Sequence, residues 1–495
     1  MKRFVTVKII MALSVAAASL AGCTKTEESY QYVNLSQVSC SFLGEGSQPL
    51  AITVKASPAT WEATPGATWV KVERTDDRTL TVTVEDNETG AERSTVINIA
   101  AGQATQEILV SQLAKDSEFA RFRKLDTFQM GAAMSPSGKY AGGFVTTIAA
   151  DDSYQFQPTI VDIETGEWHQ FGPFPQTLYA LHQTMAVTDQ GLLFITDGQN
   201  GGQIAIDLTG DIFIPEAPAG YSGKPEIQGT SADGKYWVGF AMDKTRDEGG
   251  LYRPLLWTDG TPKELPILDL NYRDEEIWVG VMARGISADG RIIYGTSWEN
   301  SDFGMLYWIN EGGNTAAPKW VGEDVREVTE TEMEMPDGTP YDTHIVNGLI
   351  CEAQLTKISP SGKWIASTYR TEAVAEDRKS LVLTHTAAFY NTETETTTIV
   401  EDYGESTGMH VTDDGIAFVG IGTLGISTSK VYDLNTNTDL GSMEDWVYDN
   451  YGIIVPAGCI NYISGDGKVV LGTSPQASAG GTNFINWYVA PPVTK

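Results

Sequence analysis

Histidine is scarce among the residues that could carry chemistry in this chain of 495 residues, which contains five histidines. Imidazole nitrogens bind divalent transition metals. Four of the five stand at the starts of predicted strands or in long insertions, namely His182, His344, His385 and His410. No His-x-x-x-His pair or similar local spacing is present, so these side chains could meet at a metal only through the tertiary fold. A metal site is therefore the minor hypothesis, and the sequence predicts no cofactor.

Aromatic and arginine residues form a second set, spread over the longest predicted connections. Sugars stack their C–H faces on flat rings and bond their hydroxyls to charged side chains, so this composition as a set suits a glycan, although any single member more often serves loop packing. The candidates for ligand binding are Tyr154, Arg246, Tyr272, Arg273, Trp278, Trp298 and Arg370. No catalytic residue is assigned, because the chain has no Gly-x-Ser-x-Gly elbow and its many carboxylates single out no glycosidase pair.

Polar residues near the starts of predicted inner strands form a third set. Most of them lie six to eight residues before a turn glycine, where strands of a closed ring would open towards its centre. Inner strands otherwise favour apolar residues, so this set predicts a polar central funnel; the alternative is a water-filled channel without a ligand. The candidates are His182, Gln183, Gln228, Arg284, Gln354, His410 and Asn461.

A repeated turn positions all three sets. Patterns such as Ser135-Pro-Ser-Gly138 and Ser231-Ala-Asp-Gly234 occur seven times, and their glycines are separated by 53, 43, 56, 72, 53 and 52 residues. Serine, threonine or aspartate side chains bond nearby backbone amides in such turns, and glycine supplies a positive φ. Because aspartates recur at this place in the repeats, we predict that they are structural and neither metal ligands nor acids.

A second tight turn follows in most repeats, so each repeat is predicted to hold four strands. Seven such units over residues 119–495 indicate a seven-bladed β-propeller. Residues 119–128 precede the first repeat, and we expect them to supply the strand that the last repeat lacks. Both tight turns of a blade would lie on one side of the ring, which leaves the long connections on the other as the predicted binding face. The acidic stretch Glu323–Asp342 is predicted to be a solvated insertion there.

The repeats resemble known extracellular ones. Gly-Ile/Thr-Ser-Ala-Asp-Gly followed by a strand that ends in Trp, at 229–257 and 285–308, resembles HAF-type repeats, and the Ser-Pro-Ser-Gly-Lys copies resemble TolB-like propeller repeats. The turn motif also resembles that of oligogalacturonate lyases, which hold a divalent metal with three histidines and a glutamine. That resemblance implies the alternative function, a metal-dependent polysaccharide lyase or another carbohydrate-active enzyme.

Residues 31–113 show alternating strand runs at roughly ten-residue spacing, such as Leu50–Val54 and Leu80–Val84, which predict a small immunoglobulin-like β-sandwich. Trp61 and Trp69, an Asn-x-x-Gly-x-x-Arg element from Asn87 and the terminal Val110-Ser-Gln resemble the BACON domain. The resemblance implies an accessory carbohydrate-binding module or a spacer. Trp61 and Trp69 are expected to fill the core rather than bind sugar. Residues 114–118 are predicted to be a linker.

Residues 1–22 are predicted to be a signal peptide, because three basic residues precede an apolar run too short to cross a membrane, where ~20 residues are needed. Leu20-Ala-Gly-Cys23 resembles the lipobox of bacterial lipoproteins, which implies that Cys23 is lipidated and that residues 23–30 form a lipidated tether. Thr24–Glu28 resembles the export tag of Bacteroidetes surface lipoproteins. Cys40, Cys351 and Cys459 then remain, and we expect them to be buried.

The net charge of −32 excludes nucleic acid as a main partner and argues against anionic membrane surfaces. The sequence therefore predicts an all-β protein anchored by lipid in the cell outer membrane, exposed at the surface or, alternatively, facing the periplasm. Its propeller would bind a glycan or a partner protein of a glycan-uptake system. Enzymatic activity is left open, and a non-catalytic protein–protein scaffold is the second alternative.

Overall fold

The computed structural model describes most of the chain. The described ranges are 31–35, 39–42, 44–47, 49–91, 93–115, 121–125, 132–148, 154–176, 183–196, 203–221, 225–243, 252–277, 279–299, 302–351, 357–422, 428–478 and 481–491. Cys23 and the predicted signal peptide lie outside them. Within these ranges the fold is all-β, as predicted, apart from one α-helix and the short 3-10 helices η1 (Glu323–Val325) and η2 (Glu401–Tyr403).

Two four-stranded sheets near the N-terminus pack face to face. The first holds β1 (Tyr32–Leu35), β3 (Leu50–Ser57), β6 (Thr79–Val84) and β5 (Val70–Arg74), and the second holds β2 (Ser39–Phe42), β8 (Ala104–Gln112), β7 (Arg93–Ala101) and β4 (Glu62–Pro65). β2 and β8 are parallel, and the other pairs are antiparallel. Residues such as Ile52 and Leu80 of one sheet and Ile97 and Ile108 of the other form a single fully buried core.

The tryptophans of this sandwich serve its structure. Trp61 is 4% exposed, and its indole N–H donates to the carbonyl of Asp77 over 3.0 Å. Arg93 lies over the ring of Trp69 at 4.4 Å and donates to Gln112, which joins the end of β7 to β8. Trp61 is therefore a core residue, as predicted, and the ring of Trp69 is covered by a guanidinium.

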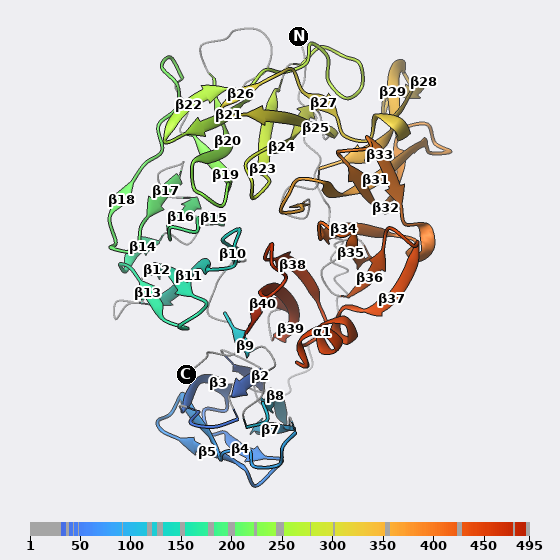
Figure 1. Cartoon of the computed structure of the whole chain (residues 1–495). Helices are drawn as coiled ribbons and strands as arrows, with labels where there is room; N and C mark the ends of the chain where they lie inside the picture. The colour runs from blue at the N-terminus through green and yellow to red at the C-terminus, as the bar shows by residue number, and fades with distance from the viewer. Residues whose placement is uncertain are drawn as a thin grey trace, which may run out of the picture.

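The rest of the chain forms antiparallel meanders, which Figure 1 shows side by side around a ring. The first meander holds β10 (Ala133–Met134), β11 (Tyr140–Ile148), β12 (Tyr154–Asp162) and β13 (Trp168–Gln170), and β14 (Phe174–Gln176) also pairs with β12. The second holds β15 (Gln183–Val187), β16 (Leu193–Thr196), β17 (Gln203–Ile206) and β18 (Ile212–Phe213). The third holds β19 (Glu226–Thr230), β20 (Tyr236–Met242), β21 (Tyr252–Thr258) and β22 (Thr261–Glu264). In each, the first strand lies nearest the centre of the ring and is called its inner strand.

Four further meanders continue the ring. They are β23 (Val281–Ile286), β24 (Ile292–Glu299) and β25 (Asp302–Glu311) with β26 (Asn314–Thr315) and β27 (Lys319–Trp320); β30 (Lys357–Ile358), β31 (Trp364–Val374), β32 (Leu381–Asn391) and β33 (Thr396–Ile399); β34 (Ser406–Val411), β35 (Ile416–Ile421), β36 (Ser429–Asp433) and β37 (Thr438–Ser442); and β38 (Cys459–Ile463), β39 (Val470–Ser478), β40 (Gly481–Ala490) and β9 (Arg121–Lys124). Their inner strands are β23, β30, β34 and β38.

β9 supplies the outer strand of the last meander. It pairs antiparallel with β40, from Lys124 opposite Trp487 to Arg121 opposite Ala490. Phe122 is 3% exposed and its ring lies 5.8 Å from that of Trp487. The prediction that the segment before the first repeat completes the last one is confirmed, and the two ends of the ring are joined by main-chain hydrogen bonds.

The repeated turns have one chemistry. In each, the Ser or Thr hydroxyl accepts a hydrogen bond from an amide four or five residues on, over 3.0 to 3.1 Å. Asp233, Asp289 and Asp466 each accept from this hydroxyl and from the second amide after them. The turn glycines have φ between 69° and 88°. The structural role predicted for these aspartates is confirmed.

The two tight turns of a meander lie on the same side of the ring, as predicted. Backbone hydrogen bonds of 2.7 to 3.0 Å join the first turn to the second in five meanders, between residues 163 and 139, 259 and 235, 310 and 291, 392 and 363, and 434 and 415. We call this the tight-turn side. The connections from β11 to β12, from β31 to β32 and from each meander to the next leave the opposite side.

Substituting a turn glycine at a packed position should destabilise the ring. Gly362 has φ of 77°, and a Cβ there would lie 2.6 Å from Ile292 Cγ1, whereas a Cβ on Gly467, with φ of 71°, meets nothing within 4 Å. Left-handed backbone costs a non-glycine residue about 1 kcal/mol, and overpacking adds about 1–3 kcal/mol. We expect Gly362→Ala to lower the free energy of unfolding by about 2–4 kcal/mol and Gly467→Ala by about 1 kcal/mol. Urea unfolding measures both, and equal effects would contradict this account of packing.

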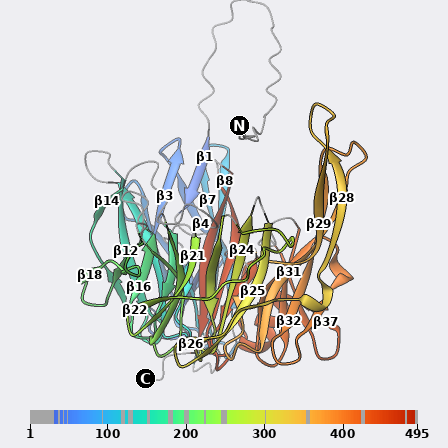
Figure 2. The ribbon, with the colours of Figure 1, turned by 90° about the horizontal axis from the view of Figure 1, so that it is seen from above.

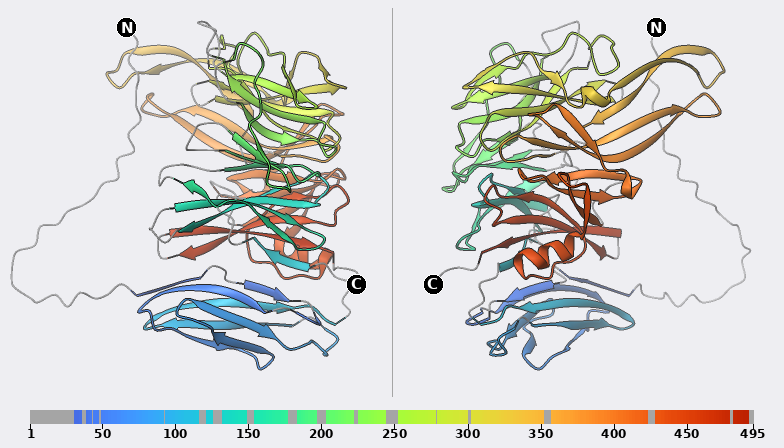
Figure 3. Two further views of the ribbon diagram at one scale, coloured as in Figure 1. Left: turned by 90° about the vertical axis from the view of Figure 1, so that its left-hand side faces the viewer. Right: turned by 45° about the vertical axis from the view of Figure 1, so that its right-hand side comes forward.

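Two long hairpins leave the ring together and form what we call the arm. One consists of the strands within residues 327–350, and the other consists of β31 and β32. β28 (Glu327–Glu334) and β29 (Pro340–Ile350) pair along their length, and β29 also pairs with β31 and, at Ile350, with β25. This bridge merges two meanders into one eleven-stranded sheet. Figures 2 and 3 show β28 and β29 projecting beyond the other strands. Most residues of Glu323–Asp342 are exposed, as the prediction of a solvated insertion requires, and most of the segment is paired strand.

The α-helix α1 (Met443–Tyr451) follows β37 and packs on the last two meanders. Ser442 caps its N-terminus by accepting from the amide of Asp445, and Gly452 ends it with φ of 67°. Met443, Val447 and Tyr451 face the core. In the part of the chain that the structure describes, no helix is both long and apolar enough to span a bilayer.

Candidate functional site

A β-bulge recurs at one position of the inner strands. The register slips at Met185, Gln228, Arg284, Met409 and Asn461, each six residues before the turn glycine of its meander. A bulge leaves the extra residue out of the ladder and re-aims its side chain. Gln228, Arg284 and Asn461, three of the predicted funnel residues, therefore occupy equivalent places on three inner strands. We call the centre-facing side of the inner strands the inner wall.

Arg284 is held from several sides on this wall. Its Nη1 donates to Gln228 Oε1 of the neighbouring inner strand over 3.4 Å, and its Nη2 donates to Met282 Sδ over 3.1 Å. The guanidinium also lies 5.3 Å from the ring centre of Phe240. Burial raises the pKa of Glu226, at the start of β19, although the charge of Arg284 acts to lower it. Asn461 donates to Thr473 Oγ1 over 2.5 Å and is engaged within its own meander.

The next residue along the inner strands forms a second layer. Four meanders have small residues five positions before the turn glycine, namely Ala133, Ala186, Gly229 and Gly285. The other three have Lys357, His410 and Tyr462 at this place, on three neighbouring inner strands. Loss of solvation lowers the pKa of Lys357 to about 8, although the nearby Cys351 and Cys459 thiols act to raise it. The sequence signal for Lys357 was its equivalence to His410, which went unnoticed.

His410 is fully buried in this layer. Its ring centre lies 5.7 Å from that of Tyr462 and 6.2 Å from that of Phe418. Burial lowers the pKa of His410 to about 3, and the charge of Lys357 acts in the same direction. Neither ring nitrogen has a hydrogen-bond partner among the described residues. His410 is therefore neutral at physiological pH.

The three remaining cysteines are buried, as expected, and none of them forms a disulfide with another described residue. Cys351 and Cys459 are 1% and 0% exposed. Burial raises the pKa of the Cys459 thiol to about 12, although a backbone hydrogen bond from Thr473 and the charge of Lys357 act to lower it. A thiol with a raised pKa is a poor nucleophile, so Cys459 has no reactive character here.

Two predicted arginines meet at a carboxylate that the sequence did not single out. Arg273 Nη1 and Nη2 donate to the two oxygens of Glu372 over 2.9 and 2.8 Å, and Arg370 Nη2 lies 2.9 Å from Glu372 Oε1. The side chain of Glu372 is 2% exposed. Burial alone would raise the pKa of Glu372, but hydrogen bonds from Arg273 and the Val346 amide, with both guanidinium charges, hold that pKa below its usual value.

This cluster fastens the arm to the ring. Arg273, in the connection from β22 to β23, also donates to the carbonyl of His344 in β29 over 2.6 Å, and Glu372 in β31 accepts from the amide of Val346 over 2.8 Å. Arg273 and Arg370 thus hold strands together, and both guanidinium groups pair with Glu372. They are placed on the predicted side of the ring but act as structural groups there.

Of the remaining ligand-binding candidates, only Tyr272 has a side chain that the structure describes. Tyr272 is fully buried, with its ring centre 5.1 Å from that of Trp320 and no room for a Cβ on Gly304 or Gly348 beside it. A ring in this position offers no face to a sugar, so Tyr272 is corrected to a packing residue. Tyr154 and Trp298 lie in β12 and β24, where their side chains are outside the described part. Arg246 and Trp278 lie outside the described residues.

Three of the four predicted metal ligands are described by the structure, and these three do not come together at one site. His344 is in the arm, and its Nδ1 lies 3.4 Å from Glu275 Oε1. His385 is in β32, and its Nδ1 lies 2.8 Å from Glu405 Oε1. His410 lies on the inner wall, and His182 is outside the described residues, as is Gln354; Gln183 begins β15, with its side chain outside that part. Among the described residues, no three His, Cys, Asp or Glu side chains are grouped to hold a metal ion. The grouping of His344, His385 and His410 at one metal is corrected accordingly.

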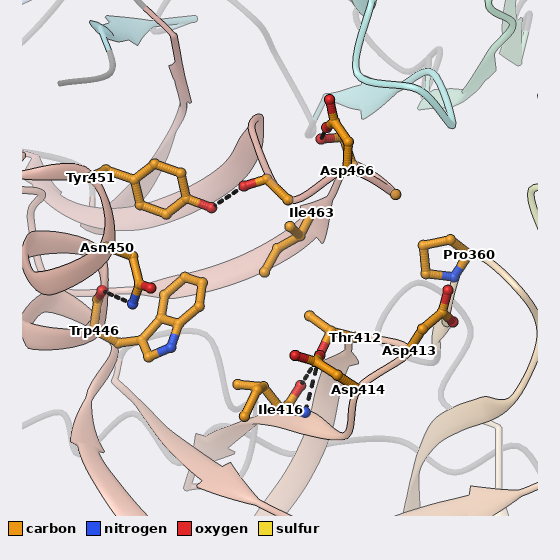
Figure 4. Close-up of a pocket in the computed structure, with 13 residues that line it drawn as sticks. Pro360, Thr412, Asp413, Asp414, Ile416, Trp446, Asn450, Tyr451, Ile463 and Asp466 are labelled. Atoms are coloured by element: carbon orange, nitrogen blue, oxygen red, sulfur yellow. Dashed lines mark hydrogen bonds between the residues drawn. The ribbon is translucent and has the colours of Figure 1, made fainter. Parts of the chain in front are cut away.

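A pocket of about 440 Å³ opens on the tight-turn side, between the last two meanders and α1 (Figure 4). Its aromatic wall is Trp446 and Tyr451, whose hydroxyl donates to the carbonyl of Gly467 over 2.6 Å. Its carboxylates are turn residues. Asp413 accepts from the amide and hydroxyl of Ser361, Asp414 from Thr412, and Asp466 from Ser464. The carboxylates that line this pocket therefore stabilise the tight turns.

One comparison with known proteins identifies the family of the N-terminal sandwich. Residues 59–113 match the family model BACON, described as "Putative binding domain, N-terminal", and this confirms the resemblance seen in the sequence. No curated protein matches the chain.

Three similar solved structures are an oligogalacturonate lyase from Vibrio parahaemolyticus, the β-propeller domain of the Trilobed protease from Pyrococcus furiosus and a Bacteroides ovatus GH5 xyloglucanase in complex with a heptasaccharide. The lyase is 12% identical, with 81% of this chain and 97% of that chain covered and a TM-score of 0.41. The protease domain is 11% identical, with 82% and 96% covered and a TM-score of 0.35. The xyloglucanase is 20% identical, with 27% and 31% covered and a TM-score of 0.15. At these scores none carries an argument about the function of this chain.

Proposed function

We propose that this chain is an exported lipoprotein, anchored through Cys23 in the outer membrane, whose ring is a seven-bladed β-propeller that binds a glycan at its inner wall. The BACON-like sandwich then serves as a spacer between the anchor and the ring. The ligand enters from the side of the ring opposite the tight turns. Glu226 and Gln228 are in β19 and precede the turn glycine Gly234 by eight and six residues, so they lie towards this entry side.

One observation carries the proposal. Gln228 Nε2 and Arg284 Nε are buried atoms without a hydrogen-bond partner in the described part of the chain, and both belong to bulged residues of neighbouring inner strands. A buried donor without a partner costs about 1–3 kcal/mol, so such atoms are retained where a ligand or water meets them. Sugar hydroxyls and ring oxygens accept hydrogen bonds from amide and guanidinium groups.

A glycan array tests this function with the soluble chain from residue 24 and its Arg284→Met variant. We expect the wild-type chain to bind a restricted group of glycans and the variant to lose at least nine-tenths of that signal. Lys468→Gln is the matched control, because Lys468 is 66% exposed and lies in a tight turn on the far side of the ring. Binding that survives Arg284→Met, or no binding to any glycan, would contradict the proposal.

The arm supports a second candidate function, a docking site for a partner protein. Val382 and Leu383 of β32 are 54% and 44% exposed, and Met335, in the turn between β28 and β29, is 46% exposed. The two hairpins are tied near their tips, where the amide of Glu334 donates to the carbonyl of Arg378 over 2.8 Å. Exposed apolar residues on a projecting, stiffened hairpin pair are typical of an interaction surface. A partner captured by the chain and lost on Val382→Asp would favour this scaffold role.

A further inference from the structure

A carboxylate stands beside the donors of the inner wall. Glu226 of β19 lies opposite Phe240 of β20 in the ladder, and side chains directly opposite each other share one face of a sheet. The guanidinium of Arg284 lies 5.3 Å from the ring centre of the same Phe240. The charge of Arg284 also acts to lower the pKa of Glu226, although burial raises that pKa. Glu226 and Arg284 therefore lie close together on neighbouring inner strands.

Hydrogen bonding leaves this group of side chains incomplete. In the described part of the chain no hydrogen bond or ion pair engages the carboxylate of Glu226, whose pKa is influenced only by burial and by the charge of Arg284. Arg284 donates to Gln228 Oε1, but Arg284 Nε and Gln228 Nε2 have no partner among the described residues. An ionised carboxylate only accepts hydrogen bonds, whereas guanidinium and amide N–H groups only donate them. A ligand that completes all three groups must therefore donate to Glu226 and accept from Arg284 and Gln228.

The charges around this site cancel. Glu226 and Arg284 contribute one negative and one positive charge. In the next layer, His410 stays neutral because burial lowers its pKa, and the charges of Lys357 and Asp413 act on that pKa in opposite directions. A charged ligand would meet a like charge at this wall, and the juxtaposition of like charges costs affinity. The inner wall therefore favours an uncharged ligand.

We infer that Glu226, Gln228 and Arg284 bind neighbouring hydroxyl groups of an uncharged sugar, and that they select neutral glycans over acidic and amino ones. A hydroxyl group both donates and accepts, so it can donate to Glu226 while its oxygen accepts from Arg284 or Gln228. The carboxylate of a uronic acid cannot donate to Glu226, and the ammonium group of an amino sugar cannot accept from Arg284. The inference rests on the proposed function, because it names the class of glycan that the inner wall takes.

A glycan array tests the inference when it holds each sugar ring in three forms, namely the neutral hexose, the uronic acid and the amino sugar with a free amine. The soluble chain from residue 24 is applied at neutral pH. We expect it to bind neutral forms at least about ten-fold more tightly than the matched charged forms. Free glycine, a zwitterion whose two charges would also fit Glu226 and Arg284, is added as a competitor and should not displace the glycan.

The variant Glu226→Gln separates a role in binding from a structural one. It keeps the shape of the side chain but removes the negative charge beside Arg284. Neutral forms should therefore bind less tightly, and their advantage over uronic acids should fall at least about ten-fold, whereas a structural defect would weaken all forms alike. Glu393→Gln is the matched control, because Glu393 is exposed in a tight turn on the far side of the ring, and it should change neither value. Equal thermal transitions in calorimetry establish that both variants fold, and the preference of the wild-type chain tests the inference without them.

The failures separate this inference from the proposed function. Charged forms that bind as tightly as the neutral ones, displacement by free glycine, or an unchanged preference in Glu226→Gln would overturn the inference and leave the glycan function standing. An array without binding to any form would contradict the proposed function, and the inference with it.

Discussion

Glu372→Ala is expected to lower the free energy of unfolding of the ring by about 3–5 kcal/mol, the cost of breaking a buried ion pair by removing one partner. Glu372 is the common acceptor of Arg273 and Arg370, whose side chains are 16% and 6% exposed. Its loss leaves two guanidinium groups with poor solvation and removes the bond to the Val346 amide. The arm should loosen first, because Glu372, Val346 and His344 are where the cluster joins β31 to β29.

Differential scanning calorimetry measures this effect, with Glu332→Ala as the control. Glu332 belongs to the same arm but is 54% exposed, so its pair with Arg378 contributes at most about 1 kcal/mol. Amide hydrogen exchange should show faster exchange in β28 and β29 for Glu372→Ala alone. Equal effects of the two substitutions would mean that the cluster does not hold the arm.

The contribution of Glu372 also depends on pH, with a definite sign. Its pKa is lowered in the folded chain, so its stabilising effect is complete above the unfolded value of about 4.3 and is lost as the pH falls through the lower, folded value. The difference in stability between wild type and Glu372→Ala should therefore be constant near neutrality and shrink only in acid. A difference that shrinks as the pH rises from 5 to 8 would contradict the assigned direction of the pKa shift.

Phe122→Ala is the second substitution with a large expected effect, about 3–5 kcal/mol of destabilisation. Phe122 is 3% exposed in β9 and packs against Trp487 of β40, so truncation opens a cavity at the seam where the ends of the ring join. Arg123 is the control, because successive side chains of a strand point to opposite faces and Arg123 is only half-buried. Its truncation to Ala should cost less than about 1 kcal/mol.

Calorimetry distinguishes closure from a general loss of stability. The sandwich has its own core and should keep its transition, while the ring transition should move to lower temperature in Phe122→Ala. A shift of both transitions by the same amount, or no difference between Phe122→Ala and Arg123→Ala, would contradict the role of β9 in closing the ring.

The repeated elements were predictable because each is built from local chemistry. A hydroxyl and a glycine with positive φ suffice to specify a turn, so Ser231 and Gly234 could be recognised without any tertiary contact. The β9–β40 pairing followed from counting strands, since a ring of equal units leaves one segment over at the start and one gap at the end. The inner-wall positions of Gln228 and Arg284 followed from their constant distance to the turn glycine.

What sequence reasoning missed depends on contacts between distant segments. Arg273 and Glu372 are 99 residues apart, and only the bridge through β29 brings them together. The hairpin that makes this bridge was hidden by its charge, because Val328 and Met333 stand among glutamates, although Pro336-Asp-Gly338 is a turn signal. Tyr272 was misassigned for the same reason, since its burial is provided by Gly348 of that hairpin and by Trp320.

The inner-wall account is tested most directly by a crystal structure of the soluble chain with the glycan that binds best on the array. We predict sugar density within hydrogen-bond distance of Gln228 Nε2 and Arg284, reached from the side opposite the tight turns. Density on Trp61 or Trp69 of the sandwich, or in the pocket beside Trp446, with the inner wall free of sugar, would contradict the account.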